Sequence, residues 1–348
     1  MKAGIVGTGF MARTHAEALA RLGIAVGGVV GSRAVDFAPT YGSFDEMLAD
    51  VDVVHVCSPN NLHFEQAHAA LQAGKHVVCE KPLALSSSQA HQLCAAASEY
   101  GLVNAVCFIS RFYPLCQEAA SRSVDARLIT GNYLQDWLSN DTDWNWRLEP
   151  AVGGPLRAVG DIGSHWLDLV SYVTGQRVEA VMADLTTVLP TRRRPTGEVE
   201  TFAASSGPTE PVEMSTEDVA GVLLRFGGGA RGVLTLSQVS PGRKNHLSFE
   251  ISGASESLAW NTENPEQLWI GHRDEPNQLQ LRSAGDYPAG HAQGYPDAFK
   301  ALFRAVYVAV DGGPRDGYPT FEDGFEQVLV GEAIAESARL GQWVPVQR

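Results

Sequence analysis

Alternating apolar and helix-forming runs over the first third of this 348-residue chain restrict its fold more than any other feature. Short apolar runs that predict buried strands lie at residues 3–6, 24–30, 52–57, 76–79 and 103–108, with helix-forming stretches between them at about 43–50, 63–74 and 86–100. Strands that alternate with helices are typical of a doubly wound parallel sheet. The sequence therefore predicts an α/β domain at the start of the chain.

A glycine turn joins the first predicted strand to a helix-forming stretch that runs to Leu22. In such a turn Gly7 permits a tight reversal, and Gly9 lets backbone N–H groups approach a pyrophosphate at the helix N-terminus. A lone turn of this kind is equally typical of simple structural turns, but strand, turn and helix together favour a dinucleotide-binding Rossmann domain. The residues expected to contact the cofactor here are Gly7, Gly9, Phe10 and Met11.

The end of the second strand bears on which dinucleotide binds. An acid usually holds the adenosine ribose there, whereas this chain has Ser32 and Arg33. Arginine pairs bidentately with a 2′-phosphate, which favours NADP over NAD. Asp36 lies close by, and Arg33 is also typical of a solvated surface charge, so both cofactors stay open.

Polar residues follow the next two strands at their carboxyl ends, the edge where open α/β sheets bind ligands. Ser58, Pro59 and Asn60 follow the run at 52–57, and His63 begins the next helix, in a site role or a local packing role. Glu80 and Lys81 follow the run at 76–79, held by Pro82, which fixes φ and removes a donor.

A predicted helix at 156–174 places three ionisable groups on one face. Asp161, His165 and Asp168 are spaced i, i+4 and i+7 in an otherwise apolar stretch. They are compatible with a solvated stripe, a metal site or acid–base chemistry. A second His or Cys cluster with ligand spacing is lacking in the sequence, so we expect no metal.

Taken together and in this order, the turn at 7–12, SPN at 58–60, EKPLA at 80–84 and D-x-x-x-H-x-x-D at 161–168 resemble the Gfo/Idh/MocA family of nicotinamide-dependent oxidoreductases, which act mainly on sugars and cyclitols. The resemblance implies that Lys81 contacts the nicotinamide and the substrate hydroxyl, that Glu80 lies near the nicotinamide ribose, and that the Lys81–Pro82 bond is often cis. It implies that Asp161 orients the substrate and that His165 is catalytic. Asp168 has a structural or a substrate-binding role.

These residue types suit the oxidation of a secondary alcohol. A neutral imidazole is matched to proton abstraction near neutral pH, so we expect His165 to be the base. The Lys81 ammonium would stabilise negative charge that develops on the oxygen. Asp161 would orient the imidazole or a neighbouring hydroxyl.

From about residue 125 the pattern changes to consecutive strands. Strand-like runs lie at 126–138, 178–189, 217–226, 231–239, 246–252 and 256–260. Helices are expected near 156–174, 292–311 and 321–340, and an exposed loop is expected at 191–216. The sequence predicts a dinucleotide-binding domain at 1–122 and an α+β substrate-binding and oligomerisation domain at 123–348 with an open-faced, mainly antiparallel sheet. The resemblance implies that the outer face of this sheet pairs with another subunit, in a homodimer or homotetramer.

Three residues of the second part are candidates for sugar contacts. Trp146 and Arg147 belong to an unusually aromatic polar loop, in which indole faces could stack on a pyranose, although core or interface packing explains tryptophan equally well. His291 precedes Tyr295 at the start of a predicted helix.

Composition excludes several partners. The formal net charge of −14 and the pI near 5.1 oppose binding to nucleic acid or to anionic membranes. The basic run Arg192–Arg194 is expected to be a solvated loop. Five cysteines without a C-x-x-C motif favour a reducing cytoplasm, and the N-terminus does not read as a signal peptide.

The sequence therefore predicts an NAD- or NADP-dependent dehydrogenase of a sugar, sugar derivative or cyclitol, as a cytoplasmic homo-oligomer. Two alternatives remain. One is an enzyme that uses bound cofactor for a transient oxidation during elimination or epimerisation, and the other is a catalytically silent cofactor sensor.

Overall fold

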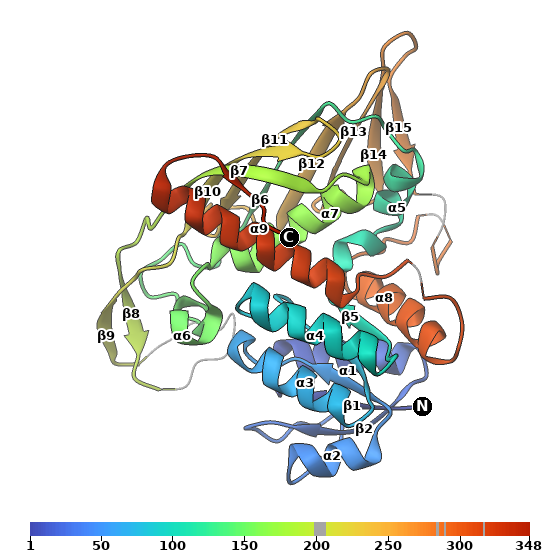
Figure 1. Ribbon diagram of the computed structural model, residues 1–348, viewed down its shortest axis with the longest axis vertical. Coiled ribbons are helices and arrows are strands. Elements are labelled where there is room, and N and C mark those ends of the chain that lie inside the picture. Colours follow the sequence, from blue (N-terminus) through green and yellow to red (C-terminus); the bar gives the residue numbers. More distant parts are fainter. Residues whose placement is uncertain (198–206, 283–284, 289, 316) are drawn as a thin grey trace. The chain divides into compact units, whose positions relative to one another are not determined.

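The chain forms two compact units (Figure 1). The computed structural model describes residues 1–197, 207–282, 285–288, 290–315 and 317–348. The first unit comprises Met1–Ile109, Ala151–Gly154 and Tyr295–Val328, and the second comprises Ser110–Pro150, Pro155–Gly294 and Leu329–Arg348. Each unit has its own sheet.

The first unit contains a five-stranded parallel sheet in the order β2-β1-β3-β4-β5. Its strands are β1 (Lys2–Val6), β2 (Ala25–Val30), β3 (Val53–Val56), β4 (His76–Cys79) and β5 (Asn104–Val106). Its helices include α1 (Phe10–Arg21), α2 (Phe44–Asp50), α3 (His63–Gln72), α4 (Ser87–Glu99) and α8 (Tyr295–Val310), with a 3₁₀ turn η1 at Asn60–Leu62. The predicted Rossmann architecture is confirmed.

Local sequence explains where these helices begin. The Ser43 hydroxyl accepts a hydrogen bond from the Glu46 N–H at 3.1 Å, and the Ser86 hydroxyl accepts one from the Gln89 N–H at 3.3 Å. Each serine thereby satisfies a donor of the first helical turn that lacks an intrahelical partner. The buried faces of the helices then cover a core of small and branched apolar side chains from the sheet.

The order of the strands fixes the ligand-binding edge of the first sheet. Strand β1 lies between β2 and β3, so the winding reverses beside it, and its carboxyl end neighbours that of β3. Gly7, directly after β1, has a φ of +112°, and a Cβ there would lie 2.6 Å from the carbonyl oxygen of Cys57. Only glycine therefore fits this turn.

The second unit contains a nine-stranded sheet in the order β15-β14-β13-β12-β6-β11-β10-β7-β16. Its strands are β6 (Leu128–Leu134), β7 (Val178–Thr186), β10 (Val219–Phe226), β11 (Arg231–Ser237), β12 (His246–Ser252), β13 (Glu256–Asn261), β14 (Gln267–His272), β15 (Gln278–Leu281) and β16 (Val344–Pro345). Neighbours are antiparallel except β6 and β11. The open-faced, mainly antiparallel sheet is confirmed, while β14, β15 and β16 were not predicted.

One face of this sheet is covered and the other is open. Side chains along β10 and β11 alternate between buried and exposed, as expected for a sheet with one solvated face. Helix α7 (Ser164–Thr174) lies on the covered face, where the Trp166 indole N–H donates to the Ser248 carbonyl at 2.8 Å. A Cβ on Gly131 of β6 would lie 2.4 Å from that indole nitrogen, so this glycine permits the close approach of the helix.

Further short elements complete the second unit. They are η2 (Ile109–Phe112, with Ile109 in the first unit), α5 (Pro114–Ser121), η3 (Trp146–Leu148), α6 (Pro150–Gly153, shared with the first unit), η4 (Val159–Gly163), β8 (Thr191–Pro195) and β9 (Thr209–Glu213). The long helix α9 (Phe321–Leu340) begins in the first unit and continues in the second.

Two predictions for this region were wrong. Residues 191–216 are not simply an exposed loop, because β8 and β9 pair antiparallel, while 198–206 lie outside the described residues. The predicted helix at 156–174 is also not one continuous α-helix: residues 159–163 form the π-helical segment η4, and the α-helix follows it. The residue pattern does not show that β8 and β9 pair over a long sequence distance. It also does not show that residues 159–163 wind as a π-helix.

Candidate active site

The N-terminus of α1 is suited to bind a pyrophosphate. Its N-cap residue, Gly9, offers no side-chain cap, and a Cβ there would meet nothing within 4 Å. The first-turn N–H groups therefore face open space at the positive end of the helix. Phe10 is 47% exposed at the start of the helix, and Met11 accepts a contact from the Tyr295 hydroxyl at 3.7 Å.

The edge after β2 exposes Ser32 and Arg33 to solvent. Asp36, further along the same loop, is exposed and accepts a hydrogen bond from Arg13 of α1 at 2.7 Å. That bond is the first cause of a lowered Asp36 pKa. Asp36 is thus engaged with a cation of the same unit.

The His63 ring lies within hydrogen-bond distance of the segments that follow β3 and β4. Its Nε2 lies 2.9 Å from the Ser58 carbonyl and its Nδ1 lies 2.7 Å from the Pro82 carbonyl. Burial lowers the pKa of His63, so a neutral ring donates to one of the two carbonyls at a time. Asn60 donates to the Gly153 carbonyl at 2.8 Å, and the Ser58 hydroxyl donates to Gln66 at 2.5 Å.

Glu80 and Lys81 occupy the end of β4, as predicted. The Glu80 side chain is buried, and its Oε2 accepts the backbone N–H of Lys81 at 3.2 Å. Its Oε1 lies 3.1 Å from Nε2 of His15, a fully buried residue of α1. The Lys81–Pro82 bond is cis, and the Lys81 side chain is half-buried.

Asp161 is the central residue of the π-helical segment in the second unit. Its Oδ2 accepts a hydrogen bond from the Gln238 amide at 2.8 Å, and its Oδ1 accepts one from Nε of Arg147 at 3.2 Å. Both oxygens are therefore fixed. A π-helical turn at this position is notable because such segments are frequent at functional sites.

His165 is the second residue of the α-helical part, one turn after Asp161. Its side chain is half-buried, and its ring lies 6.3 Å from that of Tyr133, measured between centroids. Arg147 lies with its guanidinium 4.3 Å from the Trp146 ring centroid, and the Asn145 side chain accepts from both its backbone and its guanidinium. Trp146 and Arg147 are thus held near Asp161 by the Arg147 bond.

Asp168 does not share an open face with Asp161. Its side chain is fully buried, and Arg111 pairs with it bidentately at 2.8 and 2.5 Å. The guanidinium of Arg111 also lies 5.2 Å from the Tyr172 ring centroid. A solvated stripe is therefore excluded for Asp168, since burial gives it an internal partner that helical spacing cannot reveal.

A buried polar network supports the segment that carries Asp161. Glu217 accepts the backbone N–H groups of Arg157 and Val159 at 2.8–3.1 Å, and burial raises its pKa. Arg157 donates to Gln238, the partner of Asp161, at 3.2 Å, and pairs with Asp218. The rigid support of Asp161 therefore extends at least two side chains into the unit.

Arg192 belongs to the same network, which contradicts its predicted place in a solvated loop. It is fully buried and donates to Asp218 at 2.7 Å and to the Leu138 carbonyl at 2.9 Å. Asp218 keeps a lowered pKa because Arg157 and Arg192 outweigh the effect of burial. Arg192 is therefore a buried structural residue, because the fold gives it a partner 26 positions along the chain, whereas Arg193 and Arg194 of the same run are about half exposed.

His291 lies apart from these contacts. It is exposed, its Nδ1 is 3.2 Å from the Pro288 carbonyl, and α8 begins four residues later, at Tyr295. It therefore precedes the predicted helix rather than starting it.

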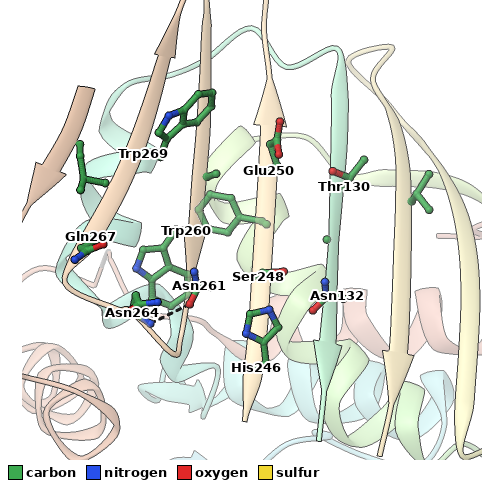
Figure 2. A pocket seen from close by; sticks show the side chains of 15 residues that line it. Thr130, Asn132, His246, Ser248, Glu250, Trp260, Asn261, Asn264, Gln267 and Trp269 are labelled. Atoms are coloured by element: carbon green, nitrogen blue, oxygen red, sulfur yellow. Dashed lines mark hydrogen bonds between the residues drawn. The ribbon is translucent and has the colours of Figure 1, made fainter. Parts of the chain in front are cut away.

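A shallow hollow of about 660 Å³ lies on the second unit and contains none of the predicted site residues. Figure 2 shows its polar side chains, among them Thr130, Asn132, Ser248 and Glu250, presented side by side from neighbouring strands. These residues are on the open face of the nine-stranded sheet.

His15, Gln238 and Arg111 are site or support residues that sequence reasoning missed. A histidine in the helix after the glycine turn was the one available signal for His15; Gln238 and Arg111 had none, because their partners are distant in sequence. Among the described residues, the group of three side chains with metal-ligand spacing is His15, Glu80 and Cys107, whose ligand atoms lie within 4.8 Å of one another. No described helix is long and apolar enough to span a bilayer.

Comparison with known proteins supplies an independent view. Residues 1–108 match the model of the Gfo/Idh/MocA oxidoreductase family, NAD-binding Rossmann fold, and residues 124–259 match that of the Gfo/Idh/MocA C-terminal domain.

Relatives match over most of the chain. Levoglucosan dehydrogenase of Pseudarthrobacter phenanthrenivorans is 29% identical over 99% of this chain and 98% of its own length. D-glucoside 3-dehydrogenase of Escherichia coli is 32% identical over 76% of this chain and 78% of its own length. A solved structure of levoglucosan dehydrogenase in complex with NADH and L-sorbose aligns over all of this chain and 99% of its own, with a TM-score of 0.88 and 27% identity.

Proposed function

The chain belongs to the Gfo/Idh/MocA family of oxidoreductases, and from this premise we propose that it is an NAD-dependent dehydrogenase that oxidises a secondary alcohol of a sugar or cyclitol at Lys81, Asp161 and His165. Cofactor binding is assigned to residues 1–122 and substrate binding to 123–348. Glu80, Ser58, Pro59, Asn60 and His63 complete the cofactor side.

The glycine turn at Gly7 and Gly9 is the feature that suits a dinucleotide cofactor. The uncapped first turn of α1 and the open space at Gly9 suit the pyrophosphate, and Gly7 brings this turn against the end of β3. Bound nicotinamide supplies a hydride acceptor. Lys81 stabilises negative charge on the substrate oxygen, and His165 takes the hydroxyl proton.

The observation that carries the proposal is the geometry of Asp161. Both of its oxygens are held, by Gln238 and Arg147, in a π-helical segment that ends two residues before His165. Such fixed support is expected of a residue that must orient a substrate hydroxyl or the imidazole. A solvated charge on a helix surface needs none of it.

The relatives define the first substrates to test. One acts on levoglucosan and another is a D-glucoside 3-dehydrogenase, so a pyranose with free ring hydroxyls is the favoured class. Levoglucosan, methyl glucosides, free sugars and myo-inositol are incubated with the protein and NAD, and absorbance of the reduced cofactor is recorded. We expect sustained reduction with at least one pyranose.

Two variants separate the proposal from its alternatives. Lys81→Ala and His165→Ala are expected to lower kcat by at least about a hundredfold while NAD still binds, measured by fluorescence titration. Product that forms without net NAD reduction would instead indicate an elimination or an epimerisation. A protein that binds NAD but converts no member of the panel would favour the sensor.

We further propose that NADP is accepted as well as NAD. Exposed Ser32 and Arg33 offer a hydroxyl and a guanidinium after β2, while Asp36 is engaged with Arg13. Parallel kinetics with both cofactors test this.

The open sheet face is proposed to pair with a second copy of the chain, in a homodimer or homotetramer. Leu223, Val233, Leu279 and Leu281 are 42–60% exposed on β10, β11 and β15, and Val233 and Leu279 are among the residues that line the hollow. Exposed apolar side chains on one sheet face favour association. Light scattering after gel filtration should show an oligomer that Val233→Lys weakens.

All five cysteines are free, which supports a reducing cytoplasm.

A further inference from the structure

Buried hydrogen-bonding side chains form a series behind Glu80 in the first unit. Nε2 of the fully buried His15 lies 3.1 Å from Oε1 of Glu80, and its Nδ1 lies 3.0 Å from Nδ1 of His55, on β3. Nε2 of His55 lies 3.0 Å from the hydroxyl of Tyr307, on α8. The series therefore runs from Glu80 through both rings to Tyr307, across four separate segments of the unit.

The far end of the series determines where the His55 proton lies. Burial raises the pKa of Tyr307, so its hydroxyl keeps its proton. Among the described residues Nε2 of His55, 3.0 Å away, is the hydrogen-bond partner of this hydroxyl, so a buried O–H that needs an acceptor donates there. Burial, followed by the charge of His15, holds the pKa of His55 well below its ordinary value, so this ring is neutral. A neutral ring that accepts at Nε2 carries its proton on Nδ1. His55 therefore donates to Nδ1 of His15.

His15 must then present a proton to Glu80. Its Nδ1 accepts from His55, and Sγ of Cys57 lies 3.2 Å from the same nitrogen. Burial holds the pKa of the Cys57 thiol well above its ordinary range, so this neighbour is a neutral thiol and not a thiolate that would favour a proton on Nδ1. With Nδ1 occupied as an acceptor, the ring proton is on Nε2, directed at Oε1 of Glu80.

Glu80 connects the His15 ring to Lys81, the next residue in the chain. Its Oε1 faces His15, and its Oε2 accepts the backbone N–H of Lys81 at 3.2 Å. The two oxygens of one carboxylate thus couple the His15 ring to the backbone of Lys81. A carboxylate held at both oxygens has little rotational freedom.

We propose that His15 is a positioning residue of this enzyme: its Nε2–H fixes the Glu80 carboxylate beside Lys81, and His55 and Tyr307 hold the His15 ring in the orientation that does so. The proposal rests on the proposed function, in which Lys81 contacts the reacting alcohol. It adds to that function the reason why an otherwise apolar interior contains two adjacent histidines. His15 would act on Glu80 as the third member of a catalytic triad acts on the base, by holding it in one orientation.

Three side chains at this place also have the spacing of a metal site. His15, Glu80 and Cys107 each offer a ligand atom within 4.8 Å of the others. Metal binding needs a thiolate and a bare imidazole nitrogen. Burial and the Glu80 charge raise the pKa of Cys107 well above its ordinary range, and Nε2 of His15 carries a proton in the series. The hydrogen-bonded series is therefore favoured over a metal site.

Kinetic variants test the role of His15 in the full-length enzyme. His15→Leu removes both nitrogens, His15→Gln retains an N–H near the position of Nε2, and Tyr307→Phe removes a single hydroxyl at the far end. His76→Leu is the matched control, because this histidine of β4 bonds to the Val103 N–H outside the series. The measurements are kcat, KM for NAD and for sugar, the pH profile of kcat, and the melting temperature.

The pH profile must be interpreted with all groups around Glu80. The titratable side chains that act on it or near it are, by element, His15 of α1, Cys57 after β3, His63 of α3, Cys79 of β4, the adjacent Lys81, and Cys107 after β5. The four variants leave every other member of this set unchanged. A difference between variant profiles therefore reports on the series.

We expect His15→Leu to lower kcat at least about tenfold and to move the acid limb of the profile up by about one pH unit, because an ionised carboxylate loses a donor. His15→Gln should restore most of kcat, and Tyr307→Phe should shift the limb less, in the same direction. If His15→Leu lowers only the melting temperature, as His76→Leu would, the proposal is overturned.

A measurement without turnover separates this inference from the proposed function. In protein labelled with ¹⁵N-histidine, the signal of His15, assigned by its loss in His15→Gln, should show a proton on Nε2 at pH 7. A proton on Nδ1 with a bare Nε2 overturns the positioning role, even in an active enzyme. One equivalent of zinc in the purified protein that His15→Gln lacks would overturn it in favour of a metal site. The Nε2–H form in a protein that oxidises no sugar would leave the His15–Glu80 bond established and refute the dehydrogenase function.

Discussion

Replacing Arg111 with methionine removes the guanidinium that pairs with Asp168 inside the second unit. The Asp168 side chain is fully buried and that of Arg111 is 11% exposed, and two hydrogen bonds of 2.8 and 2.5 Å join them. Methionine keeps much of the length and apolar contact of arginine but has no charge. The variant therefore isolates the ion pair from the packing.

The expected cost follows from this burial. Removing one partner of a buried pair destabilises a protein by about 3–5 kcal/mol, because the other charge stays in a low-dielectric interior. Loss of the contact with the Tyr172 ring adds less than about 1 kcal/mol. At about 2 °C per kcal/mol, the melting temperature of Arg111→Met should fall by about 6–10 °C.

Tryptophan fluorescence is the suitable assay, because all seven tryptophans lie in the second unit. Arg194→Met is the matched control: its partner Glu210 is about half exposed, and the melting temperature should barely change because water screens an exposed pair. Asp168→Leu in the Arg111→Met background should recover part of the loss, since it removes the remaining charge.

Kinetics decide between the two roles left open for Asp168. If its role is structural, folded Arg111→Met keeps kcat and the sugar KM within about twofold of the parent. A loss of stability below about 1 kcal/mol together with a raised sugar KM would refute the reasoning and favour a substrate contact.

Three further predictions concern other parts of the chain. Gly7→Ala should lower stability by about 1–3 kcal/mol and weaken NAD binding in a fluorescence titration, because its Cβ would lie 2.6 Å from the Cys57 carbonyl at a φ of +112°; unchanged binding would contradict this. Arg33→Ala should raise KM for NADP at least about tenfold and leave KM for NAD within twofold in parallel assays, whereas equal changes would refute the 2′-phosphate contact. Burial raises the pKa of Glu217 above 4.5, so the stability that its protonated form contributes is complete below that pH and is lost as pH rises through the folded value. Glu217→Gln should therefore gain stability relative to the parent as pH rises above 4.5, and a constant difference in urea midpoints would contradict this.

The candidate site divides into a part that local sequence predicted and a part that it could not. Gly7, Glu80 and Lys81 were placed correctly because each follows a short apolar run, and the carboxyl ends of such strands meet at one edge of a parallel sheet. The burial of Asp168 and Arg192 was not predicted, because each is paired with a residue at least 26 positions away.

The sequence by itself determined the alternation of strands and helices in the first unit, the glycine turn and the open-faced character of the second sheet, since these follow from side-chain period and backbone conformation within a few residues. Tertiary structure decided which polar groups are buried and how they are paired. It placed His15 against Glu80 and His55, held Asp161 between Gln238 and Arg147, and wound residues 159–163 as a π-helix. The physical reason is that a buried polar group is stable only with a partner of suitable geometry, and the fold brings such partners together from distant parts of the chain.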